Sequence, residues 1–281
     1  MRKLDVPACD ACLSLETCIS NLRDAALRSK FTAIKTAIIA AETAYKNCGP
    51  NGNFYTIAEK TTVAGRVTVK EMERLYKGTF SRKKSRARRI YDEIKTAIGI
   101  CPLCAQRDVS TLDHYLAQSR HPALTVTPVN LVPACSSCNK AKLDRQPSSA
   151  GEQTLHPYYD DVDDEPWLCA RVIEDNPPAM VFFADPPKIW PAVKQERVRT
   201  HFRTFELSAL YSTHAAAELL NMHLDLMRIA ARGDADDLRR HLIEQKESRE
   251  AVAKNSWQGA MYKALSESDW FCTEGYKFIR T

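Results

Sequence analysis

The sequence lacks any long apolar run and any repeated or low-complexity tract. No stretch approaches the roughly eighteen consecutive apolar residues of a membrane-spanning helix, so a membrane span is excluded. The first residues, MRKLDVP, lack the apolar segment of a secretory signal peptide. Cysteine is plentiful, however, with 10 residues in 281, and without a secretory signal these thiols favour metal binding or free cysteine over disulfides. A cytoplasmic protein is therefore predicted.

The size and charge of the chain are those of an ordinary soluble protein. Its 281 residues are enough to bury a sizeable core, in two or three subdomains. Apolar residues make up 44% of the chain and charged residues 27%. The net charge of +5 and the pI of about 8.6 permit nucleic-acid binding without requiring it.

Four cysteines form two C-x-x-C pairs, Cys101 with Cys104 and Cys135 with Cys138, about thirty residues apart. A C-x-x-C turn lets two thiolates reach one metal ion, and two such turns complete a tetrahedral zinc site with no open coordination position. A single redox dithiol would need only one such pair, and chance pairing is the remaining alternative. The spacing therefore predicts a structural zinc ion.

The residues between and beside these cysteines have side chains suited to binding a metal ion and to transferring a proton. Asp113 and His114 end a short β-like run that begins at Val109, Asn130 precedes the second cysteine pair, and Asn139 follows its last cysteine. Aspartate and asparagine supply the hard oxygen ligands that Mg²⁺ prefers, and histidine is suited to take a proton from water near neutral pH. Taken singly, each could be a surface, turn or capping residue. Their combination within a zinc frame favours a catalytic site.

At these residues the chain resembles the HNH (ββα-metal) endonuclease family, in its treble-clef form with two zinc knuckles. The three name-giving positions correspond to His114, Asn130 and Asn139, which makes this an H-N-N variant. The resemblance implies that His114 is the general base and that Asn130 holds the loop carrying it. It also implies that Asp113 and Asn139 bind a catalytic Mg²⁺ or Mn²⁺ ion.

The same resemblance implies metal-assisted hydrolysis of a phosphodiester bond, leaving 5′-phosphate and 3′-hydroxyl ends. Lys142, four residues after Cys138, would approach a phosphate. The family motif often continues after Asp-His as Y-L-P-K, whereas this chain has Tyr115-Leu116-Ala117-Gln118. The resemblance covers about forty of the 281 residues, and the flanks match larger bacterial HNH proteins more loosely. Such proteins resemble effector subunits of bacterial anti-phage systems that work beside an ATPase.

A dense run of positive charge, RKKSRARR, precedes the first cysteine pair. The side chains in question are Arg82, Lys83, Lys84, Arg86, Arg88 and Arg89. Most such runs are solvated faces, but the position of this one, upstream of the nuclease-like motif, favours a sequence-independent phosphate-binding face. The run leads into a predicted helix over 90–98, and Arg86 and Arg89 are expected to share a helix face.

Two further groups of residues carry weaker indications. Cys9, Cys12, Cys18 and Cys48 make a second zinc site arithmetically possible, but buried free cysteines are the preferred interpretation. His156, in the segment His156-Pro-Tyr-Tyr-Asp160, is expected to be a packed or capping histidine rather than a ligand.

The predicted fold class is α+β: a mainly α-helical protein with a central zinc-stapled ββα-metal module. Residues 1–98 are expected to form a helical region that ends in the basic run, residues 99–160 the nuclease module, and residues 161–281 a mainly helical C-terminal region. Helical spacing is expected over 15–45, a hairpin or extended loop over 61–69, and short strands at 172–173 and 180–183. Gly233 and Asp234 predict the end of one helix and the start of the next.

The predicted function is a metal-dependent DNA endonuclease, with RNA as an open alternative substrate. The competing interpretation is a non-catalytic subunit whose zinc knuckles bind nucleic acid or whose helical flanks contact another protein. Such a subunit would need neither the Asp-His pair nor the asparagine after the last cysteine, and this chain has both.

Overall fold

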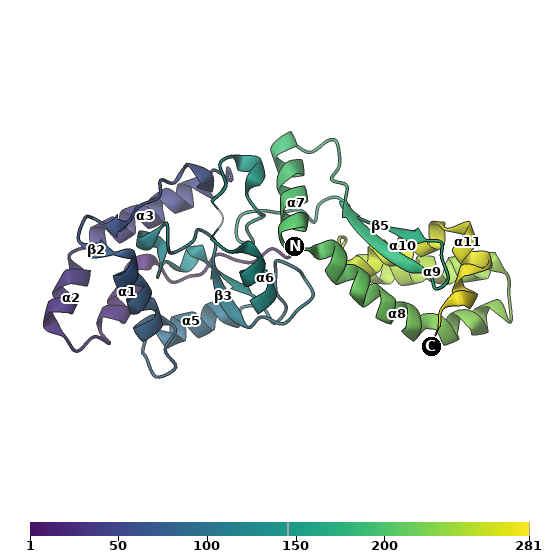
Figure 1. The fold of residues 1–281 in the computed structure, drawn as a ribbon, viewed down its shortest axis with the longest axis horizontal. Helices are drawn as coiled ribbons and strands as arrows, with labels where there is room; N and C mark the ends of the chain where they lie inside the picture. The colour runs from purple at the N-terminus through teal and green to yellow at the C-terminus, as the bar shows by residue number, and fades with distance from the viewer. Residues whose placement is uncertain (145, 281) are drawn as a thin grey trace. The chain divides into compact units, whose positions relative to one another are not determined.

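Helices and three separate two-stranded antiparallel sheets make up the fold, in a computed structural model that describes residues 1–144 and 146–280 (Figure 1). The α+β class is therefore confirmed. The chain divides into two units, unit 1 (Met1–Asp161) and unit 2 (Val162–Thr281). No helix in the described part of the chain is long and apolar enough to cross a membrane.

Unit 1 contains six α-helices, two hairpin sheets and several short 3₁₀ or π segments among its described residues. In chain order these are α1 (Ala11–Ile19), α2 (Ala25–Thr32), α3 (Lys35–Cys48), η1 (Phe54–Thr56), β1 (Thr62–Val63), β2 (Val67–Thr68), α4 (Val69–Leu75), the π-helical η2 (Tyr76–Phe80), α5 (Arg88–Lys95), β3 (Thr111–His114), η3 (Pro122–Leu124), η4 (Pro128–Asn130), β4 (Leu131–Ala134), α6 (Ser136–Lys142) and η5 (Ala150–Glu152).

The N-terminal helical stretch is three helices and not the continuous helix predicted over 15–45. The Asp24 carboxylate caps α2 by accepting hydrogen bonds from the backbone N–H groups of Ala26 and Leu27, at 2.8 and 3.1 Å. The prediction missed the breaks because Phe31 and Ile34 keep a helical spacing across the turn between α2 and α3, and both are buried. Of the two forms expected over 61–69, a hairpin or an extended loop, the hairpin is present as β1 and β2.

The strands β3 and β4 and the helix α6 form a ββα unit. β3 pairs antiparallel with β4, so that Asp113 lies opposite Val132 and His114 opposite Leu131. Helix α6 follows β4 directly and contacts β3. This order places the end of β3 beside the helix that carries Asn139.

The ββα unit shares one hydrophobic core with the N-terminal helices. Buried side chains of α1, α3, α4 and α5 pack with Leu112 of β3, Leu131 of β4 and Val126, which lies between η3 and η4. Helix α5 contacts both strands. The regions predicted as 1–98 and 99–160 therefore lie within a single unit, while the predicted boundary after residue 160 falls at the division between the units.

Unit 2 is a strand hairpin covered by helices. Its elements are β5 (Leu168–Ile173), β6 (Ala179–Ala184), α7 (Ala192–Thr204), α8 (Leu207–Ala230), α9 (Ala235–Glu250), α10 (Trp257–Glu267), α11 (Asp269–Thr273) and η6 (Gly275–Phe278). Helix α10 contacts β5 and α9, and α8 contacts β6 (Figure 1). The predicted strands and the break at Gly233 are confirmed, since Asp234 caps α9.

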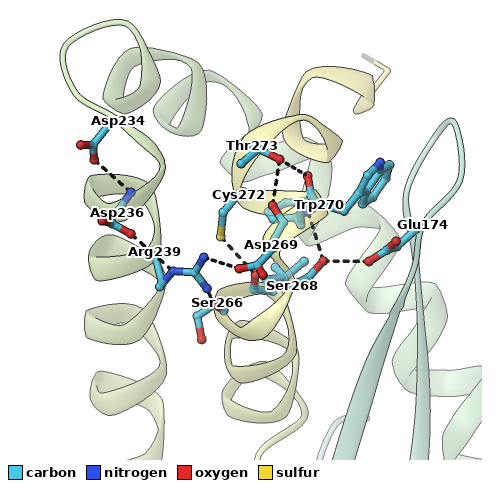
Figure 2. Close-up of polar contacts among 12 residues, drawn as sticks. Glu174, Asp234, Asp236, Arg239, Ser266, Ser268, Asp269, Trp270, Cys272 and Thr273 are labelled. Atoms are coloured by element: carbon cyan, nitrogen blue, oxygen red, sulfur yellow. Dashed lines mark hydrogen bonds and ion pairs between the residues drawn. The ribbon is translucent and has the colours of Figure 1, made fainter.

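An exposed polar network joins α9 to the start of α11 in unit 2. The Arg239 guanidinium donates to the Asp269 carboxylate at 2.7 Å and to the Ser266 carbonyl at 2.5 Å (Figure 2). The Ser268 hydroxyl accepts from the backbone N–H of Phe271 and so caps α11. These contacts fix the corner between α10 and α11 relative to α9.

Candidate functional site

Four buried cysteines converge in unit 1. Their sulfur atoms, from Cys101, Cys104, Cys135 and Cys138, all lie within 4.8 Å of one another. Four thiolates at this separation are the donor set of a closed tetrahedral zinc site. The cluster could therefore hold a structural metal such as zinc.

Local backbone geometry positions each pair of thiols. In the first pair, the Cys101 N–H donates to the Arg107 carbonyl at 2.7 Å, and Ala105 adopts the left-handed conformation, with φ of 52°. In the second pair, Cys135 is the N-cap of α6, and its sulfur accepts a hydrogen bond from the Cys138 N–H at 3.3 Å. The Arg107 N–H approaches the Cys104 sulfur at 3.5 Å in the same manner.

The N-terminal cysteines form no comparable group. Within residues 1–144 and 146–280, the Cys101 cluster is the only set of three or more potential ligands close enough to share an ion. Cys18 is buried, and burial raises its thiol pKa to about 12. Cys9, Cys12 and Cys48 are free and only half-buried, so the expectation of buried free cysteines holds fully for Cys18 alone.

Three of the four catalytic residues expected from the sequence meet at one cleft, and the fourth, Asn130, lies in the interior. Asp113 and His114, at the end of β3, and Asn139, on α6, all line a cavity of about 470 Å³, which we name the His114 cleft. Tyr76 and Ser81 also line it. The aspartate and the histidine reach the same cleft although they are adjacent in a strand, whose side chains normally alternate between faces; β3 ends at His114.

Hydrogen bonding and burial set the state of the His114 ring. Its Nε2 lies 2.9 Å from the Thr125 carbonyl oxygen. A carbonyl only accepts, so Nε2 carries the proton, and Nδ1, which bonds to no described residue, keeps its lone pair. Burial lowers the pKa of His114 to about 4, against a smaller opposing effect of the Thr125 hydrogen bond. The ring is therefore neutral at pH 7, with Nδ1 able to accept a proton.

Asp113 is paired with Lys142 in the interior. The ammonium of Lys142 lies 2.8 Å from Asp113 Oδ2 and donates to the His114 carbonyl at 2.6 Å. Both side chains are less than 10% exposed. Burial raises the pKa of the Asp113 carboxyl, and the Lys142 charge partly offsets this.

This position of Lys142 differs from the phosphate contact expected of it. The side chain does not line the His114 cleft, and its ammonium is enclosed by protein acceptors. The cause is its place on α6: in the last turn the side chain points to the end of β3, where a buried carboxylate needs a cation. Lys142 thus acts on Asp113 and not at the surface.

Asn130 is fully buried and bonds to the loop that follows His114. Its Oδ1 accepts from the Leu116 N–H at 2.8 Å, and its Nδ2 donates to the Leu116 carbonyl at 3.0 Å and to the Leu124 carbonyl at 3.2 Å. These three hydrogen bonds pair both backbone groups of Leu116, and they give the Leu124 carbonyl a second donor beside the Thr127 N–H. This side chain fixes the backbone two residues beyond His114.

The oxygen donors around the cleft fit a hard divalent ion in type. Asp113 offers a carboxylate, and Asn139, half-buried on α6, offers an amide oxygen to the same cleft. The carboxylate is already occupied by Lys142. A divalent ion at Asp113 would therefore compete with, or share, that lysine's position.

The basic run lies mostly in a loop. Helix α5 begins only at Arg88, so Arg86 precedes it and the helix face expected for Arg86 and Arg89 is not formed. Arg82, Lys83, Lys84, Arg86 and Arg89 are exposed. Arg88 is half-buried: it bonds to the Ser81 carbonyl at 2.6 Å and to Asp92, and its guanidinium lies over the Tyr91 ring.

Sequence reasoning missed two parts of the site. The Thr125 carbonyl orients His114, but a backbone carbonyl is present at every position and leaves no mark in the sequence. The Tyr76 ring lies 4.9 Å from the His114 ring, and Tyr76 begins the π-helical segment η2, which no spacing pattern had indicated. His156 is fully buried, with its Nε2 bonded to the Tyr45 hydroxyl at 2.8 Å, as a packed histidine should be.

Comparisons with known proteins add one similarity. The chain is 26% identical to Protein ea31 of Escherichia phage lambda over 295 aligned positions, which cover 96% of this chain and 99% of that protein. No protein-family model matches the chain, and no solved structure does.

Proposed function

We propose that this protein is a metal-dependent endonuclease that hydrolyses phosphodiester bonds of DNA in the His114 cleft. The observation that carries the proposal is the meeting of Asp113, His114 and Asn139 at one cavity, although the first two are 25 residues or more from the third in sequence. A neutral histidine with an available nitrogen can take a proton from water, and hard oxygen donors beside it can bind the ion that holds a phosphate.

His114 is the general base in this proposal. Its Nδ1 takes a proton from a water molecule, while Nε2–H remains bonded to the Thr125 carbonyl, which holds the ring orientation and stabilises the imidazolium that forms. The water oxygen bonds to phosphorus, the bond to the 3′ oxygen breaks, and the leaving oxygen takes a proton from solvent, to which His114 later returns its own. The products are a 5′-phosphate and a 3′-hydroxyl.

Asp113 and Asn139 are the residues that would hold a Mg²⁺ or Mn²⁺ ion. When bound, such an ion supplies charge stabilisation to the phosphate and to the leaving oxygen. Lys142 keeps the Asp113 carboxylate ionised within the protein interior, because a nearby positive charge favours the charged form. Asn130 is a positioning residue, since it holds Leu116 and thereby the end of the segment on which His114 lies.

Plasmid cleavage in the presence of Mg²⁺ or Mn²⁺ tests the proposal. We expect wild type to nick or linearise the plasmid and His114→Ala to be slower by about 10²- to 10⁴-fold, the usual contribution of a general base. Zinc content and helical circular dichroism should be equal in both proteins. His223→Ala, the same substitution on α8 of unit 2, is the matched control and should cut like wild type.

Two results would count against the proposal. Equal cutting by wild type and His114→Ala would assign the activity to another site. A wild-type protein that binds DNA but cuts neither DNA nor RNA with either ion would favour the alternative, a non-catalytic zinc-knuckle subunit. The ATPase partner and the anti-phage role stay predictions, which co-purification with products of neighbouring genes would test.

A further inference from the structure

A second cleft of unit 1, which we name the basic cleft, gathers positive charge from three separate segments. Its volume is about 660 Å³, and Arg23, Arg74, Arg82 and Lys84 line it. Arg23 lies between α1 and α2, Arg74 lies on α4, and the other two lie in the loop before α5. All four side chains are exposed. Only Arg82 and Lys84 belong to the basic run that the sequence makes obvious.

The charge of the basic cleft is not neutralised within the protein. None of the four basic side chains forms an ion pair with another residue among those described, 1–144 and 146–280. Glu71 is the one acid among the described residues of the lining, and it is paired with Lys30 at 2.5 Å. That hydrogen bond lowers the pKa of Glu71 to about 2, so the pair persists at neutral pH. A cleft with this balance attracts an anion.

The loop that carries Arg82 and Lys84 is held at both ends. At its start, Arg88 donates to the Ser81 carbonyl at 2.6 Å. At its end, the backbone N–H of Arg86 donates to Asn21 Oδ1 at 3.1 Å, and Asn21 is itself bonded to the Thr17 carbonyl of α1. Because these contacts fix the loop before any ligand arrives, less conformational entropy is lost on binding.

The basic cleft and the His114 cleft share one segment of chain. Tyr76 and Ser81 line the His114 cleft, whereas their neighbours Leu75 and Arg82 line the basic cleft. Consecutive Cα atoms are about 3.8 Å apart, so the linings of the two clefts adjoin at both ends of η2. A polyanion with one phosphate group at His114 would have further phosphate groups within reach of the basic cleft.

We propose that the basic cleft binds the phosphodiester backbone of the nucleic-acid substrate to one side of the bond that is cut. Arg23, Arg74, Arg82 and Lys84 contact successive phosphate groups, independent of base sequence. The inference rests on the proposed nuclease function and adds to it the path of the substrate. It also divides the basic run: Arg82 and Lys84 bind phosphate, whereas Arg88 positions the loop.

Equilibrium binding of a fluorescent 20-base-pair DNA duplex, measured by anisotropy as a function of salt, tests this proposal. The parent is the full-length His114→Ala protein without added Mg²⁺ or Mn²⁺, so that cleavage does not interfere. We expect Arg74→Gln with Arg82→Gln to weaken binding and to reduce the slope of log K against log salt by about 2, one for each lost phosphate contact. Arg66→Gln, an exposed arginine in the β1–β2 turn, is the matched control and should leave the slope unchanged.

The outcomes separate this inference from the nuclease proposal. An unchanged slope in the double variant, with the thermal unfolding midpoint of the parent retained, would overturn the basic cleft as a backbone site. Binding of ATP that equals the affinity for the duplex would also overturn it, in favour of a free-nucleotide site. Loss of binding in the double variant would uphold the cleft even if wild type cut no plasmid, because no step of this measurement requires catalysis.

Discussion

Two ion pairs, one in each unit, differ in how much of their side chains is exposed to solvent. In unit 1, Lys142 and Asp113 have side chains 9% and 6% exposed, whereas in unit 2 Arg239 and Asp269 are 29% and 90% exposed. Desolvating two charges costs free energy that their attraction only partly returns, so buried pairs are poor contributors to stability. An exposed pair is stabilising by about 1 kcal/mol or less. The pair that is costly to build is the one beside the His114 cleft.

The difference shows that the destabilising pair lies at the candidate active site, whereas the exposed pair lies in a purely structural corner. Burial raises the pKa of the Asp113 carboxyl against the opposing charge of Lys142, and it lowers the pKa of the neighbouring His114 to about 4. The corner of α9, α10 and α11 in unit 2 needs only to hold its shape, and its polar contacts are those of an ordinary surface (Figure 2). Two adjacent groups with shifted pKa values that line one cleft are typical of a candidate active site.

The largest effect is expected from removing a thiol of the four-cysteine cluster. Cys138→Ser should lower the free energy of unfolding of unit 1 by more than about 5 kcal/mol, because structural zinc contributes directly to folding. Unit 2, whose described residues hold no such cluster, should keep its own transition. Calorimetry together with a zinc count on the purified protein would measure both.

A cysteine elsewhere in unit 1 sharpens this result. Cys48→Ser changes a half-buried free thiol by the same substitution and should change stability by about 0.5 kcal/mol or less. If Cys138→Ser kept one zinc ion per chain and melted like Cys48→Ser, the cluster would not be a metal site.

A smaller effect is expected from breaking the buried pair. Lys142→Met should destabilise unit 1 by about 3–5 kcal/mol, because it leaves the Asp113 carboxylate buried without a partner. If Asp113 is a metal ligand, Mg²⁺ should raise the melting temperature of this variant more than that of wild type, since the ion then has no lysine to displace.

Asp113→Asn in the Lys142→Met background is the control for that measurement. It removes the buried charge, so it should recover part of the lost stability and abolish the response to Mg²⁺. Equal Mg²⁺ responses in the two variants would remove Asp113 from the metal site while leaving the ion pair intact as a structural contact.

The smallest effect belongs to the exposed pair. Arg239→Ala should destabilise unit 2 by about 1 kcal/mol or less and leave unit 1 and DNA cleavage unchanged, because solvent screens the contact with Asp269. Urea unfolding monitored by tryptophan fluorescence would report it. A loss of more than about 3 kcal/mol in the free energy of unfolding would show that side-chain exposure does not predict how much each pair contributes to stability. The contrast between the two pairs would then be wrong.

The site was predictable from sequence where spacing alone determines geometry. Two C-x-x-C pairs imply a four-thiol cluster whatever lies between them, and that cluster is present. The Asp113–His114 pair and Asn139 were identified by residue type and position, and they line one cleft. Hairpins and the α9 start were predictable because turn formers and caps act over a few residues.

The features that were not predictable depend on contacts between residues that are far apart in the sequence. The breaks among the first three helices were hidden because Phe31 and Ile34 face the same core. The burial of Lys142 follows from the packing of α6 against β3, which the sequence does not state. Arg23 and Arg74 reach the basic cleft from segments about fifty residues apart, and an isolated arginine carries no sign of its neighbours.

Helix α6 carries a consequence of its own because it is so short. Its seven residues, Ser136–Lys142, follow the Cys135 cap and include Cys138 and Asn139. An α-helix turns by about 100° per residue, so the anchoring of the two sulfurs also sets the angle at which Asn139 and Lys142 leave the helix axis. One residue inserted after Cys138 would turn both side chains by about 100° away from β3, even if the fold and the thiol cluster survived. Length in this segment is therefore constrained more tightly than the identity of the exposed residues along it.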